Sequence, residues 1–266
     1  MRRFIILAGA WCCASEESAV RRVVLVIADD LSREGLRAAR TPHLDALAER
    51  GVSFENARVM GSTMVGVCAP CRAMLLTGRT LWAALSRDQQ HFAQPSLGSV
   101  LRGAGFVAAH VGKWHARHDA WYRNFDVGRA VLFKPMGEHV VYNADNASAA
   151  PVVLPLRDIG GGRVARRKGA GEPASALARC RDASPLDERD AAAAARWQRA
   201  CHSSEVFADA ALELLSEHRH ALLKLLLVVA FTAPHDPLQP PAAALARVTR
   251  ARARGAAREP ERAPRL

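Results

Sequence analysis

The stretch that decides the fold is Arg22-Val23-Val24-Leu25-Val26-Ile27-Ala28-Asp29-Asp30. Its first seven residues are almost all apolar and largely β-branched, which is typical of a strand buried on both faces of a parallel sheet. The run ends abruptly in two carboxylates. Because ligands of open α/β sheets bind beyond the carboxyl ends of the strands, we expect Asp29 and Asp30 to lie at a functional site.

Two later apolar runs have the same character and also end in polar groups. Phe106 to Val111 delivers Gly112-Lys113-Trp114-His115, and Leu225 to Phe231 delivers Thr232-Ala233-Pro234-His235-Asp236-Pro237. Helices are predicted between the strands, and a short strand is predicted at Val52 to Phe54. The first helix is expected to begin at Pro42, with Thr41 as its N-cap, and to be closed by Gly51. Further helices are expected at Arg72 to Leu76, at Ser96 to Arg102, and from an N-cap at Ser203-Ser204 to Leu215. Strands alternating with helices indicate a doubly wound α/β fold.

The length of 266 residues and the 50% content of hydrophobic residues favour one α/β domain with a substantial core. We place this domain at residues 22–241, with an irregular insertion at 150–199 and a basic, disordered tail at 242–266. Lys and Arg exceed Asp and Glu by 11, which favours an anionic partner. Aromatic interleaving, zinc-finger spacing and helix-turn-helix signals are missing, so the sequence does not indicate nucleic-acid binding.

The first residues are typical of an exported protein. Residues 1–14 combine Met1-Arg2-Arg3 with a short apolar run, which resembles a secretory signal peptide and is too short for a membrane span. Cys180 and Cys201 are candidates for a disulfide, and Asn146-Ala147-Ser148 is a glycosylation acceptor. We therefore predict a secreted or lumenal protein of the secretory pathway, a lysosome-like compartment or the periplasm.

The three strand ends together carry groups suited to chemistry on an anionic ester. Carboxylates such as Asp29 and Asp30 are the ligands that Ca²⁺ or Mg²⁺ prefers. Lys113 offers a fixed positive charge, and His115 and His235 can exchange protons near neutral pH. Taken singly, each residue also fits a turn, a solvated side chain or a loop, so the prediction depends on their joint occurrence.

A separate feature is the C-x-x-C spacing of Cys68 and Cys71, which by itself fits a redox pair or half of a zinc site. A second C-x-x-C, which would complete a zinc site, does not occur. The spacing alone leaves both readings open.

The wider segment Cys68-Ala69-Pro70-Cys71-Arg72, followed by Thr77-Gly78-Arg79, closely resembles the signature C-x-P-x-R…TGR of the type I sulfatases. Position 71 is usually Ser in that signature. Four other segments resemble the same family in the same order, over about Val23 to Pro241. They are Ala28-Asp29-Asp30-Leu31, Thr41 to Ala48, Gly112-Lys113-Trp114-His115 and Ala233-Pro234-His235-Asp236-Pro237.

The resemblance implies an alkaline-phosphatase-like, three-layer α/β/α fold with a mostly parallel central sheet. It also implies a hydrolase of sulfate esters, an arylsulfatase-like enzyme acting on sulfated small molecules or polysaccharides. Cys68 would be converted to formylglycine by a formylglycine-generating enzyme and would contribute to the metal site. Asp29 and Asp30 would bind Ca²⁺ or Mg²⁺.

The resemblance also implies a role for each remaining site residue. Arg72 would hold the nucleophile, Lys113 would contact the sulfate oxygens, and His115 would bond the formylglycine hydroxyl. His235 would sit beside the leaving oxygen and contact the substrate. One hydroxyl of the hydrated aldehyde would attack sulfur, and the other would later expel sulfate.

The family pattern adds a downstream Asp-Asn or Asp-His pair and a further Lys, which have no counterpart before Leu266. The resemblance therefore implies a C-terminally incomplete form of the fold. Three alternatives remain: a truncated or inactive sulfatase homologue, a phosphate or phosphonate ester hydrolase of the same superfamily, and a basic binder of polyanions.

Overall fold

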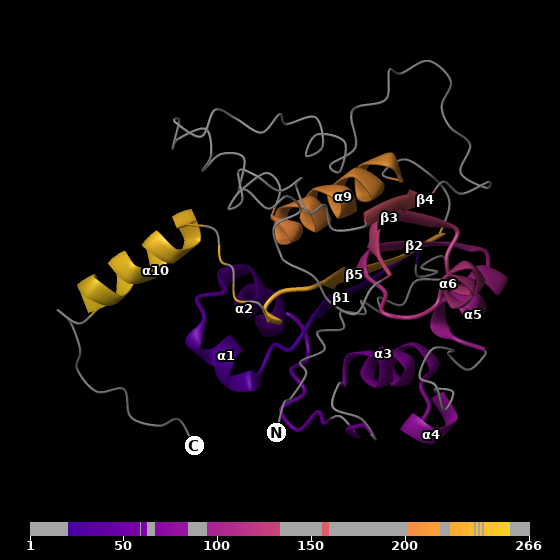
Figure 1. Cartoon of the computed structure of the whole chain (residues 1–266), viewed down its shortest axis with the longest axis horizontal. Helices are drawn as coiled ribbons and strands as arrows, with labels where there is room; N and C mark the ends of the chain where they lie inside the picture. Colours follow the sequence, from indigo (N-terminus) through magenta and orange to yellow (C-terminus); the bar gives the residue numbers. More distant parts are fainter. Residues whose placement is uncertain are drawn as a thin grey trace, which may run out of the picture.

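A computed structural model of the chain describes residues 21–58, 60–62, 67–84, 95–133, 156–159, 202–218, 224–236, 238, 240 and 242–255. Its centre is a five-stranded sheet with the strand order β1-β5-β2-β3-β4 (Figure 1). The strands are β1 (Arg22–Ala28), β2 (Phe106–Lys113), β3 (Val127–Leu132), β4 (Leu156–Ile159) and β5 (Lys224–Phe231). β1, β5, β2 and β3 run parallel to one another, and β4 pairs antiparallel with β3.

Helices cover both faces of this sheet, so the architecture is α/β with three layers. The long helix α9 (Ser203–Glu217) packs on one face, where Phe207 and Leu214 meet alternate residues of β2 and β5. On the other face lie α3 (Cys68–Thr77), α4 (Leu81–Ala84), α5 (Leu97–Gly103) and α6 (His118–Asn124). In Figure 1, α9 lies above the sheet and α3 and α4 lie below it. The predicted fold class is confirmed.

The main predicted elements are present close to their expected bounds. β2 and β5 are buried along almost their whole length, as their apolar composition predicts. α5 begins after Ser96, whose side chain forms a capping box with Ser99. α3 begins at Cys68 and ends at Thr77, with Gly78 (φ 65°) as its C-cap. The nucleophile candidate therefore lies inside the first turn of that helix and not before it.

The prediction that β1 is buried on both faces is wrong. β1 lies at an edge of the described sheet, and its side chains alternate between exposed and buried. Leu25 and Ile27 pack against the α3 side, whereas Val24 and Val26 are 42% and 45% exposed because α9 covers β5, β2 and β3 and does not extend over β1.

The predicted strand at Val52 to Phe54 is also wrong. These residues form no regular structure, and the exposed fractions of Val52 and Phe54 are 61% and 60%. α2 (Pro42–Glu49) begins at Pro42 after the N-cap residue Thr41, as predicted, but it buries no residue. The Thr41 hydroxyl donates a hydrogen bond to the Asp45 carboxylate and does not cap the backbone.

Some elements were not predicted, or were predicted differently. They include α1 (Arg33–Ala38), α4, α6, β3, and β4, which lies within the segment expected to be irregular. α10 (Ala242–Gly255) is a helix in the segment for which we predicted a disordered tail. The N-cap of α9 is His202, one residue before the predicted Ser203-Ser204, because its Nδ1 accepts a hydrogen bond from the backbone of Ser204.

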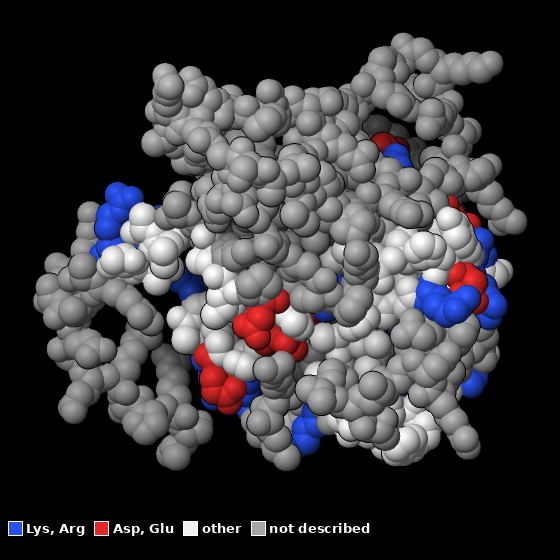
Figure 2. Space-filling view, viewed as in Figure 1, with Lys and Arg blue, Asp and Glu red and all other residues white. Residues whose placement is uncertain are grey.

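Several predictions concern residues outside those described. They are the signal peptide at 1–14, the Cys180 and Cys201 disulfide, and the Asn146 acceptor. Among the helices that the structure describes, none has the length and apolar character that a membrane span needs. Figure 2 shows acidic side chains gathered near basic ones on one face, so the described surface is not uniformly basic despite the net charge of +11.

Candidate active site

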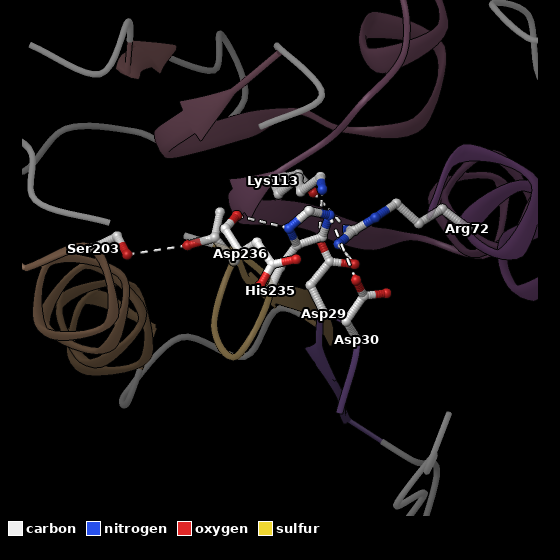
Figure 3. Close-up of polar contacts among 8 residues, drawn as sticks. Asp29, Asp30, Arg72, Lys113, Ser203, His235 and Asp236 are labelled. Atoms are coloured by element: carbon white, nitrogen blue, oxygen red, sulfur yellow. Dashed lines mark hydrogen bonds and ion pairs between the residues drawn. The ribbon is translucent and has the colours of Figure 1, made fainter. Parts of the chain in front are cut away.

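The carboxyl ends of β1, β5 and β2 lie side by side because these three strands are parallel neighbours. Their polar residues therefore meet at one edge of the sheet, where the N-terminus of α3 also lies. Figure 3 shows Asp29, Asp30, Arg72, Lys113 and His235 pointing toward one another. Three apolar runs that end in polar residues predicted that the two Asp residues, Lys113 and His235 would meet. Arg72 was expected there only from the family resemblance.

Asp29 is the centre of the group, with 1% of its surface exposed. Lys113 Nζ lies 2.5 Å from Asp29 Oδ2, and Arg72 Nη2 lies 3.5 Å from Asp29 Oδ1. Burial alone would raise the pKa of Asp29, but the positive charges of Arg72 and Lys113 outweigh that effect and hold the pKa below its ordinary value. Asp29 is therefore a buried carboxylate that carries its charge at neutral pH.

Arg72 connects α3 to the end of β2. Its Nη1 donates a hydrogen bond of 2.7 Å to the carbonyl oxygen of Lys113, and the side chain is almost fully buried. The backbone of β2 turns sharply just before this point, since Gly112 has φ 87° and the pairing of β2 with β3 shifts between Val111 and Lys113. A side chain at Gly112 would place its Cβ 2.2 Å from the carbonyl oxygen of Ala230. Only glycine fits there.

His115 follows this turn with φ 60°, and its Nδ1 is buried with no hydrogen-bond partner among the described residues. Burial, together with the charges of Lys113 and Arg72, lowers the pKa of His115 to about 4. The ring is therefore neutral at pH 7, with one nitrogen available as an acceptor.

His235 stands on the loop after β5. The Ala233-Pro234 peptide is cis, and the backbone N–H of Asp29 donates to the carbonyl of Ala233 at 3.2 Å, which ties the loop to the end of β1. His235 Nε2 lies 3.5 Å from Asp30 Oδ2, while His235 Nδ1 lies 2.8 Å from the Asp236 carbonyl oxygen. Because that carbonyl can only accept, Nδ1 carries a proton.

Cys68 lies in the first turn of α3, buried at 7% exposure, and is free of any disulfide. Burial and the negative charge of Asp29 raise the pKa of its thiol, and burial raises the pKa of Cys71 to about 11. Neither cysteine is therefore an activated thiolate at neutral pH, which argues against the redox reading of the C-x-x-C spacing.

Asp29, Cys68 and His235 each offer one ligand atom, and these atoms lie within 4.8 Å of one another. Lys113 Nζ donates a hydrogen bond to Asp29 Oδ2. Asp29 Oδ1 is buried and has no hydrogen-bond partner among the described residues. A buried acceptor of this kind fits a bound cation, and an oxygen in place of the Cys68 sulfur would suit a hard ion better. The residues present therefore fit a divalent cation.

Sequence reasoning missed one polar residue beside the site. His110 lies three residues before Lys113 on β2, fully buried among aromatic rings. The available signal was a single ionisable residue in an otherwise apolar strand.

The α/β architecture places this group of buried charges at the carboxyl ends of parallel strands. Comparison with known proteins gives the family. The sulfatase family model matches residues 21–259. The chain belongs to the sulfatase family.

The relatives agree with this assignment. The chain is similar to arylsulfatase G of the rat (Rattus norvegicus), with 34% identity over 121 residues. This match covers 39% of the chain and 22% of the rat protein. Human N-sulphoglucosamine sulphohydrolase is 37% identical over 114 residues, covering 38% of this chain and 22% of that protein. The matched region thus covers 22% of the length of each of these two curated relatives.

The fold comparison covers more of the chain. A crystal structure of Ps i-CgsB in complex with k-i-k-neocarrahexaose superposes with a TM-score of 0.54 at 19% identity, covering 85% of this chain and 48% of that one. The likeness shows that the two proteins share a fold, the alkaline-phosphatase-like α/β fold of the sulfatases.

Proposed function

We propose that the chain is the N-terminal catalytic part of an enzyme that hydrolyses sulfate esters. The observation that carries this proposal is the convergence of Asp29, Cys68, Arg72, Lys113 and His235 at one edge of the sheet in a chain of the sulfatase family. A buried lysine and arginine beside a nucleophile position suit a substrate that carries negative charge.

Two groups would complete this site, and both belong to the proposal. Asp29, Asp30 and the group at position 68 would hold a divalent cation, Ca²⁺ or Mg²⁺, which would stabilise negative charge on the sulfate oxygens. A formylglycine made from Cys68 would supply the nucleophilic hydroxyl. The position of Cys68 in the first turn of α3 directs the group at that position toward Asp29 and His235.

The residues already present account for binding and proton transfer. Lys113 would bind a sulfate oxygen, and Arg72 would hold position 68 and Asp29 in place. His115 is neutral, because the pKa of its ring is lowered to about 4, and can accept a hydrogen bond from a hydroxyl at position 68. Because Nδ1 of His235 is bonded to Asp236, only Nε2 can give a proton to the leaving oxygen, and it does so when the ring carries both protons.

The substrate class proposed here is sulfated carbohydrate. One relative, an ulvan-active sulfatase of Formosa agariphila, is 37% identical over 79 residues, covering 29% of this chain and 15% of that protein. The N-terminal sequence supports export, so a polysaccharide outside the cell or in a lumenal compartment is the substrate we propose.

The test is hydrolysis of an aryl sulfate and an aryl phosphate by the full chain, produced together with a formylglycine-generating enzyme. Mass spectrometry of the peptide that contains Cys68 reports conversion of the thiol. We expect conversion, and a higher kcat/KM on the sulfate than on the phosphate. Unmodified Cys68 in that host would exclude the formylglycine route, and preference for phosphate would favour the alternative ester hydrolase.

Matched variants separate chemistry from folding. Cys68→Ala should abolish hydrolysis, whereas Cys71→Ser, which changes the neighbouring half-buried cysteine, should retain it. Removal of divalent cations with a chelator should also abolish hydrolysis, and addition of Ca²⁺ or Mg²⁺ should restore it. Retention of aryl sulfate hydrolysis by Cys68→Ala would show that another residue is the nucleophile.

A further inference from the structure

We propose that Ser203 is a positioning residue for His235, which it holds through Thr232, the first residue of the loop after β5. Ser203 touches neither the substrate nor the reacting atoms in the proposed mechanism. Its effect on turnover rests on the proposed function, because that function places His235 beside the leaving oxygen. The hydrogen bond of Ser203 does not depend on that function, so the two can be tested separately.

A pair of buried hydroxyl groups joins α9 to the loop after β5. The Ser203 hydroxyl lies 3.0 Å from the Thr232 hydroxyl, and either oxygen can be the donor (Figure 3). Ser203 is 0% exposed and Thr232 is 2% exposed. Hydroxyls buried to this degree need hydrogen-bond partners, because bulk water does not reach them. The pair therefore links Thr232 to the start of α9.

The helix α9 is a firm support for this contact. Ser203 is its first residue, and the His202 side chain caps it by accepting a hydrogen bond of 3.2 Å from the Ser204 backbone N–H. Further along the helix, Phe207 and Leu214 are buried in the core that α9 forms with β2 and β5. The Ser203 hydroxyl therefore belongs to a helix that the core holds in place.

The backbone of Thr232 is bonded in turn to His235. The His235 backbone N–H donates a hydrogen bond of 3.1 Å to the Thr232 carbonyl oxygen, so residues 232–235 form a closed turn. The Asp29 backbone N–H donates to the Ala233 carbonyl oxygen of the same turn at 3.2 Å. The turn that carries His235 is therefore held by α9 through a side-chain pair and by the end of β1 through the backbone.

The proposed reaction depends on where His235 lies. Its Nε2 lies 3.5 Å from Asp30 Oδ2, and only Nε2 can give a proton to the leaving oxygen because Nδ1 is bonded to the Asp236 carbonyl. Proton transfer requires the donor to be within hydrogen-bond reach of that oxygen. Loss of the Ser203 contact removes one of the two supports of the turn. Displacement of a catalytic group by about 1 Å can reduce turnover about 100-fold.

The test compares variants that remove or keep the hydroxyl pair. Ser203→Ala and Thr232→Val each remove one hydroxyl, so either variant alone can carry the comparison if the other does not fold. Thr232→Ser keeps a hydroxyl at the same position. Ser204→Ala is the matched control on α9, since the contact of Ser204 with His202 is made by its backbone.

The first readout is turnover of two kinds of sulfate ester by the full chain with formylglycine at position 68. The leaving oxygen of a sugar sulfate needs a proton, whereas nitrophenyl sulfate releases a phenolate that is stable without one. We expect kcat on the sugar sulfate to fall about 10-fold in Ser203→Ala and Thr232→Val, and kcat on nitrophenyl sulfate to fall less than about threefold. Both values should stay within about threefold of the original in Thr232→Ser and Ser204→Ala.

A second readout needs neither turnover nor formylglycine. Exchange of the His235 backbone amide with solvent reports how often the turn opens, because that amide donates to the Thr232 carbonyl. In the full, unmodified chain, NMR should show this amide exchanging about 5- to 20-fold faster in Ser203→Ala and Thr232→Val. If the chain with formylglycine hydrolyses no sulfate ester, the proposed function fails, while this exchange rate still tests the contact.

Three results would overturn the proposal. The first is a folded Ser203→Ala variant whose His235 amide exchanges at the original rate. The second is an equal loss of kcat on both esters, because a smaller folded fraction would then explain the loss. The third is Thr232→Ser or Ser204→Ala losing as much kcat on the sugar sulfate as Ser203→Ala, because the role of these side chains would then be packing and not hydrogen bonding.

Discussion

At the scale of single residues, the decisive feature is that one buried carboxylate is shared by two cations. Lys113 and Arg72 both lie against Asp29, and all three side chains are at most 5% exposed. A buried charge that loses its partner is left without solvent or counter-charge, which costs about 3–5 kcal/mol. The site is therefore coupled to the stability of the fold.

This coupling gives a prediction for the Asp29 and Lys113 pair. In the presence of a chelator, Asp29→Asn and Lys113→Met should each lower the free energy of unfolding by about 3 kcal/mol, because Asp29→Asn removes the carboxylate that both cations face and Lys113→Met removes the closer of the two cations from Asp29. The double variant should lose at least about 1 kcal/mol less than the sum of the two losses. Urea unfolding of the four proteins measures this difference, and strict additivity would contradict the pairing.

A second residue-scale prediction concerns Gly112. Gly112→Ala should lower the free energy of unfolding by about 2–4 kcal/mol, because the new Cβ would lie 2.2 Å from the Ala230 carbonyl oxygen at φ 87°. Gly105 is the matched control. Its φ is 84°, and a Cβ added there would have no atom within 4 Å. Gly105→Ala should cost only about 1 kcal/mol, and equal losses in urea unfolding would show that φ alone matters.

At the scale of elements, strands buried by helices on both faces were the most predictable. The composition of β2 and β5 identified them, and the helical spacing of Val206, Phe207 and Leu214 identified α9. Polar residues at the strand ends likewise predicted where the site lies. Local sequence carries these signals because burial of one face sets the periodicity.

Other elements could not be read from local sequence, for physical reasons. Val24 and Val26 are apolar like the rest of β1, and only the position of α9 decides that they are exposed. Val52 and Phe54 have strand-forming side chains, but no strand that the structure describes pairs with their segment. The contact of Lys113 with Asp29 follows the turn at Gly112, which a composition argument does not contain.

The buried face of α9 gives a prediction for that helix. Phe207 is fully buried against β2 and β5, whereas Leu212 on the same helix is 63% exposed. Phe207→Ala should lower the free energy of unfolding by about 3–5 kcal/mol, and Leu212→Ala by less than about 1 kcal/mol. Thermal or urea unfolding distinguishes the two, and a similar loss in both would mean that α9 packs by another face.

At the scale of the whole molecule, two histidines that the fold keeps neutral make stability depend on pH. The pKa values of His110 and His115 are lowered from 6.5 to about 3 and about 4, so between pH 6.5 and 4 the unfolded chain binds protons that the folded chain does not. Stability is therefore fully present above about pH 6.5 and falls as the pH is lowered. The lowered pKa of Asp29 acts only below about pH 3.8 and does not enter this range.

From this difference we predict that His110 alone contributes a loss of about 2 kcal/mol in the free energy of unfolding between pH 7 and pH 5. His110→Gln should reduce the pH dependence by that amount, because glutamine does not titrate. Urea unfolding at both pH values measures the change. Parallel curves for the two proteins would indicate that His110 is not held neutral by the fold.

The strand order also determines when the sheet can form. β5 lies between β1 and β2, yet it is the last of the three along the chain, and Arg22 pairs with Leu225 across about 200 residues. Long-range parallel pairing of this kind closes a large loop before it gains contacts, so it folds slowly. During synthesis, β1 and β2 have no hydrogen-bonded neighbour between them until residues 224–231 emerge. Until then, Asp29 and Lys113 cannot be held in their native pair by a completed sheet.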